Sequence, residues 1–127
     1  MVDCRPDKAP TPSDLVARRA EHVRTLDLAV RRLVVTLAGV EGVTRVSLFG
    51  SYARGQRDLF TDLDVLVVWD TDLPPVERLK VLYRLLHLPV DLDLVCYTPA
   101  EFEAMHGRPF FRQITTEERV LLEKKPA

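Results

Sequence analysis

Gly50, Ser51 and Arg54 are residue types that can bind a phosphate, and they follow directly on the apolar run 43–49. A glycine lets a backbone approach a phosphate closely because it has no side chain in the way. A serine in the first turn of a helix offers a hydroxyl and an unpaired N–H to an anion. Arg54 lies one turn further on, within reach of the same phosphate. A Gly-Ser pair alone is most often only a turn.

Two carboxylates, Asp62 and Asp64, open the next apolar run, 63–69. Residues i and i+2 of a strand point to the same face, so we expect these side chains to stand next to each other. Their mutual repulsion favours a cation between them. Carboxylate oxygens are the ligands that suit Mg²⁺ or Mn²⁺. An isolated Asp-x-Asp also occurs on solvated strand edges, so this pair needs further support.

Further acids occur in the segment 90–95, Val-Asp-Leu-Asp-Leu-Val. In a central strand, an unpaired charge at Asp91 or Asp93 would be strongly destabilising. An edge strand with one wet face would show the same alternation, and both acids share one face. Together with the Asp-x-Asp pair, three carboxylates on neighbouring strands can hold two divalent ions for in-line displacement at phosphorus. One ion lowers the pKa of the attacking hydroxyl, and the other neutralises the leaving pyrophosphate.

The elements that must position these residues alternate between helix and strand. Thr11-Pro12-Ser13-Asp14 predicts a helix start. Apolar residues at spacings of three and four then continue to Gly39, either as one helix or as two that break within 22–27. The remaining pattern predicts strands over 43–49, 63–69 and 90–97, helices over 73–88 and 98–105, and a mixed segment over 110–122 that packs back on the core.

Such a pattern favours an α/β (α+β) fold in which a small mixed sheet is flanked by helices. The 127 residues are 46% hydrophobic, which predicts one globular domain over residues 11–127 after a flexible tail over residues 1–10. The formal charge of -1 gives no basic footprint, so no direct binding of nucleic acid is expected. No apolar run is long enough to span a bilayer, and we expect a soluble, cytoplasmic protein.

The stretch Val46 to Gly55, V-S-L-F-G-S-Y-A-R-G, followed by T-D-L-D-V-L-V over residues 61–67, resembles the minimal nucleotidyltransferase family of the DNA polymerase β superfamily. That family's signature is Gly-Ser, ten residues, then Asp-x-Asp. Residues 52–61 supply the ten residues here. The resemblance covers about residues 28–123 and continues through the segments 93–102, 111–114 and 120–123.

The resemblance implies a polymerase β-like nucleotidyltransferase fold with a defined set of site residues. Gly50 and Ser51 would hold the triphosphate of the incoming nucleotide, with Arg54 matching a further family position. Asp62 and Asp64 would bind both of two Mg²⁺ ions, with Mn²⁺ as an alternative. Asp93 would bind the catalytic ion and help to activate the acceptor hydroxyl. Two points stay open: Asp91 shares a face with Asp93, and Tyr52 stands where many members have an arginine.

The resemblance also implies an activity and a partner. Small members of the family act as the antitoxin beside a HEPN-domain toxin, which implies transfer of AMP from ATP to a tyrosine hydroxyl of that toxin. Two alternatives remain. In the first, the chain is a non-catalytic antitoxin that neutralises the toxin by binding alone. It would otherwise be a small-molecule nucleotidyltransferase whose acceptor site is completed by another chain.

Overall fold

One mixed four-stranded sheet forms the centre of the protein. The computed structural model describes residues 11–124. The strands are β1 (Val43–Phe49), β2 (Leu63–Trp69), β3 (Leu92–Tyr97) and β4 (Arg119–Glu123), and they lie side by side in the order β3-β2-β1-β4. β1 is antiparallel to both β2 and β4, whereas β2 and β3 are parallel. The predicted mixed sheet is therefore confirmed.

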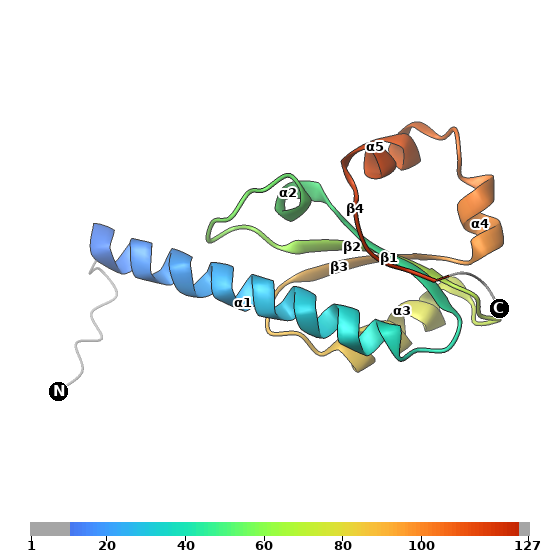
Figure 1. Ribbon diagram of the computed structural model, residues 1–127, viewed down its shortest axis with the longest axis horizontal. Helices are drawn as coiled ribbons and strands as arrows, with labels where there is room; N and C mark the ends of the chain where they lie inside the picture. Colours follow the sequence, from blue (N-terminus) through green and yellow to red (C-terminus); the bar gives the residue numbers. More distant parts are fainter. Residues whose placement is uncertain (1–10, 125–127) are drawn as a thin grey trace.

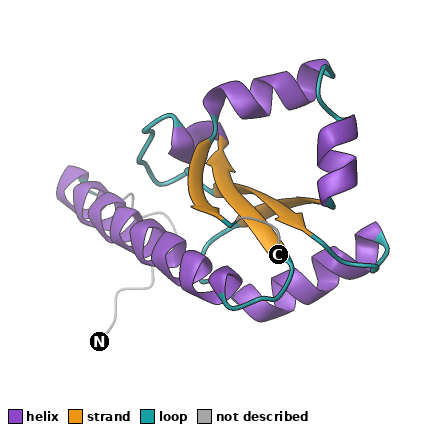
Figure 2. Ribbon diagram, turned by 45° about the vertical axis from the view of Figure 1, so that its right-hand side comes forward, coloured by secondary structure: helices purple, strands orange, loops and turns teal. Residues whose placement is uncertain are grey.

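Helices cover both faces of this sheet. They are α1 (Pro12–Ala38), α2 (Gly50–Ala53), α3 (Pro75–Leu86), α4 (Pro99–Ala104) and α5 (Pro109–Glu117). α1 and α3 lie on one face, and α4 and α5 lie on the other (Figures 1 and 2). Within residues 11–124, none of the helices combines the length and the apolar composition that a bilayer span requires.

The main core lies between the sheet and the layer of α1 and α3. Alternate residues of β2 point into it, and they meet a stripe of leucines on α1 at spacings of three and four. The fully buried members include Leu63, Val65 and Val67 of β2, Leu33 and Leu37 of α1, and Leu82 of α3. At one end of the sheet, Asp64 of β2 lies in register with Phe49 of β1 and with Asp93 of β3.

Of the two alternatives for the N-terminal segment, the structure has one helix, because the buried stripe continues through Leu26 and Ala29 without a break within 22–27. Two predicted features need correction. β3 begins at Leu92 and not at residue 90. The mixed segment 110–122 contains most of α5 and most of β4, a fourth strand that sequence reasoning missed. The predicted flexible tail, residues 1–10, lies outside the described residues.

The leucine stripe of α1 gives a direct test of the core. Leu33 is fully buried, whereas Val35 on the same helix is 75% exposed. We expect Leu33→Ala to lower the free energy of unfolding by about 2–5 kcal/mol, because it leaves a cavity. The control Val35→Ala should change it by less than about 0.5 kcal/mol. Urea denaturation followed by circular dichroism measures both, and equal effects would contradict this packing of α1.

Candidate active site

The turn between β1 and α2 lies against a carboxylate of the neighbouring strand. The antiparallel register pairs Phe49 of β1 with Asp64 of β2. Gly50 follows, with φ at +74°, in the left-handed region that favours glycine. A Cβ placed on Gly50 would lie only 2.2 Å from Oδ2 of Asp64. The glycine is therefore required both by its backbone conformation and by the close approach of this carboxylate.

Parallel pairing brings a second carboxylate to the same place. Asp64 of β2 and Asp93 of β3 are partners in the register, and Asp62 lies two residues before Asp64, just outside β2. Asp91 precedes β3 and is exposed, and its carbonyl oxygen accepts a hydrogen bond from the N–H of Leu63 at 3.0 Å. Asp93, and not Asp91, is therefore the register partner of Asp64.

The position of β3 changes one step of the sequence argument. β3 is an edge strand of the sheet, and the Asp93 side chain is exposed. The alternation of apolar and acidic residues in this segment is therefore that of an edge strand with one face in water. Asp93 is not a buried charge, so it does not require a partner. What distinguishes Asp93 is its register opposite Asp64, which the alternation alone does not reveal.

The three carboxylates influence one another's charge. Burial, followed by the negative charges of Asp62 and then Asp93, raises the pKa of Asp64 to about 6. The Arg54 guanidinium opposes this shift. Burial of a carboxyl group, and like charges held beside it without a neutralising cation, both raise its pKa. The cluster would therefore gain from a positive charge placed among the carboxylates.

A divalent cation suits the donor chemistry of this cluster, which consists of carboxylate oxygens alone. Within residues 11–124, however, no group of three or more His, Cys, Asp or Glu side chains is arranged to hold a metal ion. Asp62 and Asp93 thus lie close enough to Asp64 to raise its pKa, but the three carboxylates are not arranged as a metal site. Mg²⁺ at this place remains a prediction from the residue types.

A cavity of about 200 Å³ adjoins the glycine turn. Its lining comprises residues from the turn, from β2 and from α5: Phe49, Gly50, Arg54, Asp64, Phe110, Gln113, Ile114 and Glu117. Nη1 of Arg54 donates a hydrogen bond to Oε2 of Glu117 at 3.0 Å, and the same two atoms form a salt bridge. Ser51, Asp62 and Asp93 do not belong to this lining. Sequence reasoning did not predict that a helix in this segment lines the site, although Pro109 and the spacing of Phe111 and Ile114 are helix signals.

Tyr52 has a structural role in this protein. Its side chain is 5% exposed and lies in the core, and its hydroxyl donates a hydrogen bond to the Asp27 carboxylate of α1. The Arg57 guanidinium carbon lies 3.5 Å from the centre of the Tyr52 ring, a cation–π contact. Burial first, and the hydrogen bond to Asp27 second, raise the pKa of Tyr52. Tyr52 therefore ties α2 to α1 and does not replace the arginine that many family members have there.

A second contact joins α1 to the acid cluster. A ring nitrogen of His22, Nε2, lies 2.8 Å from the carbonyl oxygen of Thr61, the residue immediately before Asp62. The Thr61 hydroxyl in turn donates to Oδ1 of Asp58 at 3.1 Å, and it accepts from the N–H of Asp58 at 3.1 Å. The loop that leads into β2 is thus held both internally and against α1.

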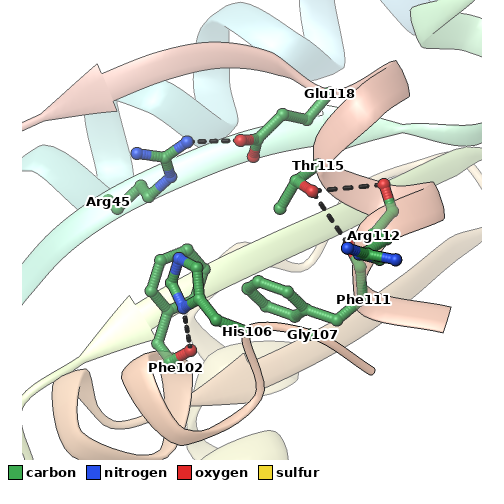
Figure 3. A pocket seen from close by; sticks show the side chains of 8 residues that line it. All are labelled: Arg45, Phe102, His106, Gly107, Phe111, Arg112, Thr115 and Glu118. Atoms are coloured by element: carbon green, nitrogen blue, oxygen red, sulfur yellow. Dashed lines mark hydrogen bonds and ion pairs between the residues drawn. The ribbon is translucent and has the colours of Figure 1, made fainter. Parts of the chain in front are cut away.

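A second hollow lies elsewhere in the structure. It has a volume of about 450 Å³ and lies between α4, α5 and the neighbouring strands (Figure 3). Arg45 and Glu118 form an ion pair in it, and the Ser47 hydroxyl donates to Oε2 of Glu118 at 2.7 Å. None of the candidate phosphate ligands or acids lines it. α5 separates the two cavities, because different sides of that helix line each one.

Comparison with known sequences points to one family. Residues 29–122 match the family model described as nucleotidyltransferase domain. A protein of Methanocaldococcus jannaschii, named for protein adenylyltransferase activity, is 29% identical over 69 residues, which make up 54% of this chain and 74% of that protein. The matched range contains the glycine turn and all three carboxylates of the cluster.

Solved structures share the fold. The crystal structure of a nucleotidyltransferase from Sulfolobus solfataricus is similar with a TM-score of 0.52 and 14% identity, over 94% of this chain and 93% of that chain. A chain of the MntA–HpeT toxin–antitoxin complex is similar with a TM-score of 0.52 and 22% identity, over 78% of this chain and 73% of that chain. At these identities the likeness establishes the common fold.

Two glycines give a matched test of the close approach at the turn. Gly50 and Gly55 both have positive φ, at +74° and +92°, but a Cβ on Gly55 would meet nothing within 4 Å. Gly55→Ala should therefore cost only the strain of an L-residue in this region, about 1–2 kcal/mol. Gly50→Ala should be more destabilising than Gly55→Ala, because it also displaces Asp64. Equal losses in urea denaturation would contradict the proposed close contact.

The raised pKa of Asp64 predicts a pH dependence of stability in metal-free protein. The folded chain keeps a proton on Asp64 up to about pH 6, whereas the ordinary pKa of an aspartate is 3.8. Stability from this group is therefore present at low pH and is lost as the pH rises through about 6. Asp64→Asn should lack that loss. Denaturation in EDTA at several pH values measures it, and parallel curves for both proteins would contradict the shift.

Proposed function

We propose that this chain, which belongs to the nucleotidyltransferase domain family, transfers AMP from ATP to a hydroxyl group of a protein. The observation that carries the proposal is the contact of the Gly50 turn with Asp64, whose pKa is raised by burial and by the charges of Asp62 and Asp93. A bare glycine turn beside clustered carboxylates is suited to a polyphosphate and its cation. The name of the Methanocaldococcus jannaschii relative supports the adenylyl group as the one transferred.

Each residue has a chemical task in this proposal. Backbone N–H groups at Gly50 and Ser51 would donate to the phosphates. Arg54 would add a positive charge there, which requires its guanidinium to be shared between Glu117 and the nucleotide. Asp62, Asp64 and Asp93 would hold Mg²⁺, which when bound supplies charge neutralisation of the pyrophosphate and acidifies the acceptor hydroxyl.

The transfer step is a displacement at the α-phosphorus of ATP. The acceptor oxygen forms a bond to this phosphorus while the bond to the bridging oxygen of the β-phosphate breaks, and pyrophosphate leaves. The hydroxyl proton passes to a carboxylate of the cluster, for which Asp93 is the candidate because it is exposed beside Asp64. The chain thus contributes orientation and charge, and no covalent intermediate on the protein is needed.

A toxin is the proposed acceptor protein. The fold is shared with a chain of the MntA–HpeT toxin–antitoxin complex, and the sequence resembles the antitoxins that act beside HEPN-domain toxins. We therefore propose that the acceptor is a tyrosine hydroxyl of a HEPN-domain toxin encoded beside this chain. Transfer of AMP to that tyrosine would then inactivate the toxin.

Incubation with ATP, Mg²⁺ and the product of the adjacent gene tests this proposal. Intact mass spectrometry should show a gain of one or more AMP units on that protein. Asp62→Asn combined with Asp64→Asn should abolish the gain, because it removes the carboxylates that would hold Mg²⁺ and with it the neutralisation of the leaving pyrophosphate. Asp93→Asn should do the same, whereas the exposed control Asp91→Asn should keep the activity.

The outcomes distinguish the three functions. A stable complex that neutralises the toxin without any mass gain would contradict the transferase and favour an antitoxin that acts by binding alone. Transfer to a small-molecule hydroxyl, with none to the protein, would replace the acceptor and keep the reaction. Equal loss of activity in Asp91→Asn and Asp93→Asn would contradict the assignment of the third carboxylate.

A further inference from the structure

One side of α5 faces the glycine turn. Phe110, Gln113, Ile114 and Glu117 follow one another at intervals of three, one and three residues, so they lie on the same side of this helix. All four line the cavity of about 200 Å³ beside the turn. Ile114 is buried and anchors the helix, and Glu117 forms the salt bridge to the end of α2. Phe110 and Gln113 are exposed, so the packing of the core does not determine their residue types.

Phe110 leaves much of an aromatic ring open next to the proposed phosphate site. It is 57% exposed, although the next residue, Phe111, is fully buried. The exposed ring forgoes the free energy that burial of its apolar surface would supply. A ring in such a position can stack on a flat ligand group, and an aromatic side chain stacks on the face of any nucleobase.

The Gln113 amide adds hydrogen-bonding groups that fit the edge of adenine. It lies three residues after Phe110, on the same side of α5, and it is exposed. Its carbonyl oxygen accepts hydrogen bonds and its NH₂ group donates them. Adenine presents a donor beside an acceptor, and an amide side chain can pair with both at once. The ring and the amide thus supply the two parts of a base-binding site: one holds the base and the other reads its edge.

The charges around the cavity favour an uncharged group on its α5 side. The charged residues of the lining are Arg54, Asp64 and Glu117. Arg54 and Glu117 neutralise each other in their salt bridge, so the lining offers no excess of positive charge to an anion. The phosphates suit the turn, where backbone N–H groups and a cation at the carboxylates can bind them. The part of the nucleotide that suits the α5 side is therefore its neutral base.

The direction of the displacement assigns this cavity to the nucleotide and not to the acceptor. The acceptor oxygen must approach the α-phosphorus from the side opposite to the leaving pyrophosphate. The pyrophosphate would lie at Gly50 and Arg54, which both line the cavity. Asp93, the candidate that receives the hydroxyl proton, does not line it. The acceptor therefore approaches on the side of Asp93, outside the cavity.

We propose that Phe110 and Gln113 form the base-recognition site of this chain, in which the Phe110 ring stacks on adenine and the Gln113 amide pairs with its edge. The inference rests on the proposed function and adds the residues that select ATP among the nucleoside triphosphates. In this arrangement, the ends of the strands hold the phosphates and the carboxylates, and α5 selects the base.

Calorimetric titration with ATP and with inorganic tripolyphosphate, each in the presence of Mg²⁺, tests the stacking. Tripolyphosphate carries the phosphates without a base, so it reports on the turn and the carboxylates alone. Phe110→Ala should weaken the binding of ATP by about tenfold or more and leave the affinity for tripolyphosphate unchanged. Phe60→Ala is the matched control, because Phe60 is 92% exposed and lies outside the cavity lining. It should leave both affinities unchanged.

Exchange of the amide for a carboxylate tests the reading of the base. A carboxylate only accepts hydrogen bonds, so Gln113→Glu loses the match to adenine and gains one to guanine, which offers two neighbouring N–H donors. The ratio of the ATP affinity to the GTP affinity should therefore fall by about tenfold. Gln56→Glu makes the same change of charge on an exposed residue outside the cavity lining, and it should keep the wild-type ratio.

These titrations need no acceptor protein, so they separate failure of base recognition from failure of the reaction. Selective loss of ATP binding in Phe110→Ala supports the base site, even where no AMP transfer is detected. Unchanged ATP binding in that variant, or equal weakening of ATP and tripolyphosphate, would overturn the base site and leave the phosphate site in place. An unchanged ratio in Gln113→Glu would overturn the role of the amide. Binding of neither ligand to the wild type would overturn the base site together with the proposed function.

Discussion

The site depends on the contact between a backbone turn without a side chain and a carboxylate. Because β1 and β2 are antiparallel, Phe49 lies opposite Asp64, and the chain must turn at Gly50 directly over that carboxylate. Any side chain at position 50 would occupy the space of Oδ2 of Asp64. The parallel partner β3 then adds Asp93 from the other side. Two pairings of opposite sense thus bring together residues that lie as far as 43 positions apart in the sequence.

α1 links the core, the site and the surface within one helix. Its second half supplies the buried stripe on which the sheet packs, and its middle contacts Tyr52 and Thr61 through Asp27 and His22. Its first half extends into solvent with Arg18 and Arg19 exposed. The two contacts hold the middle of α1 against the segments that lead into β2 and α2.

Local chemistry made much of this structure predictable. The capping boxes at Thr11 and Thr98 form as the sequence indicates, and β1 and β2 have the predicted bounds. The contacts that could not be predicted join distant residues: β4 pairs with β1 between residues that are 71 to 78 positions apart, and Glu117 of α5 meets Arg54. A five-residue strand between a helix and the end of the described chain has too few residues to show a clear period. The register that sets Asp93, and not Asp91, opposite Asp64 is likewise a property of pairing and not of either strand alone.

Binding of ATP with Mn²⁺, followed by NMR, tests the central claim most directly, because the unpaired electrons of Mn²⁺ broaden signals of nearby nuclei. The account predicts selective broadening of the backbone amides of Gly50, Asp64 and Asp93 in the wild type. That broadening should be lost in protein with Asp62→Asn and Asp64→Asn. Broadening centred on the hollow around Arg45 and Phe111, or none near Gly50, would contradict the assignment of the glycine turn and its carboxylates as the nucleotide site.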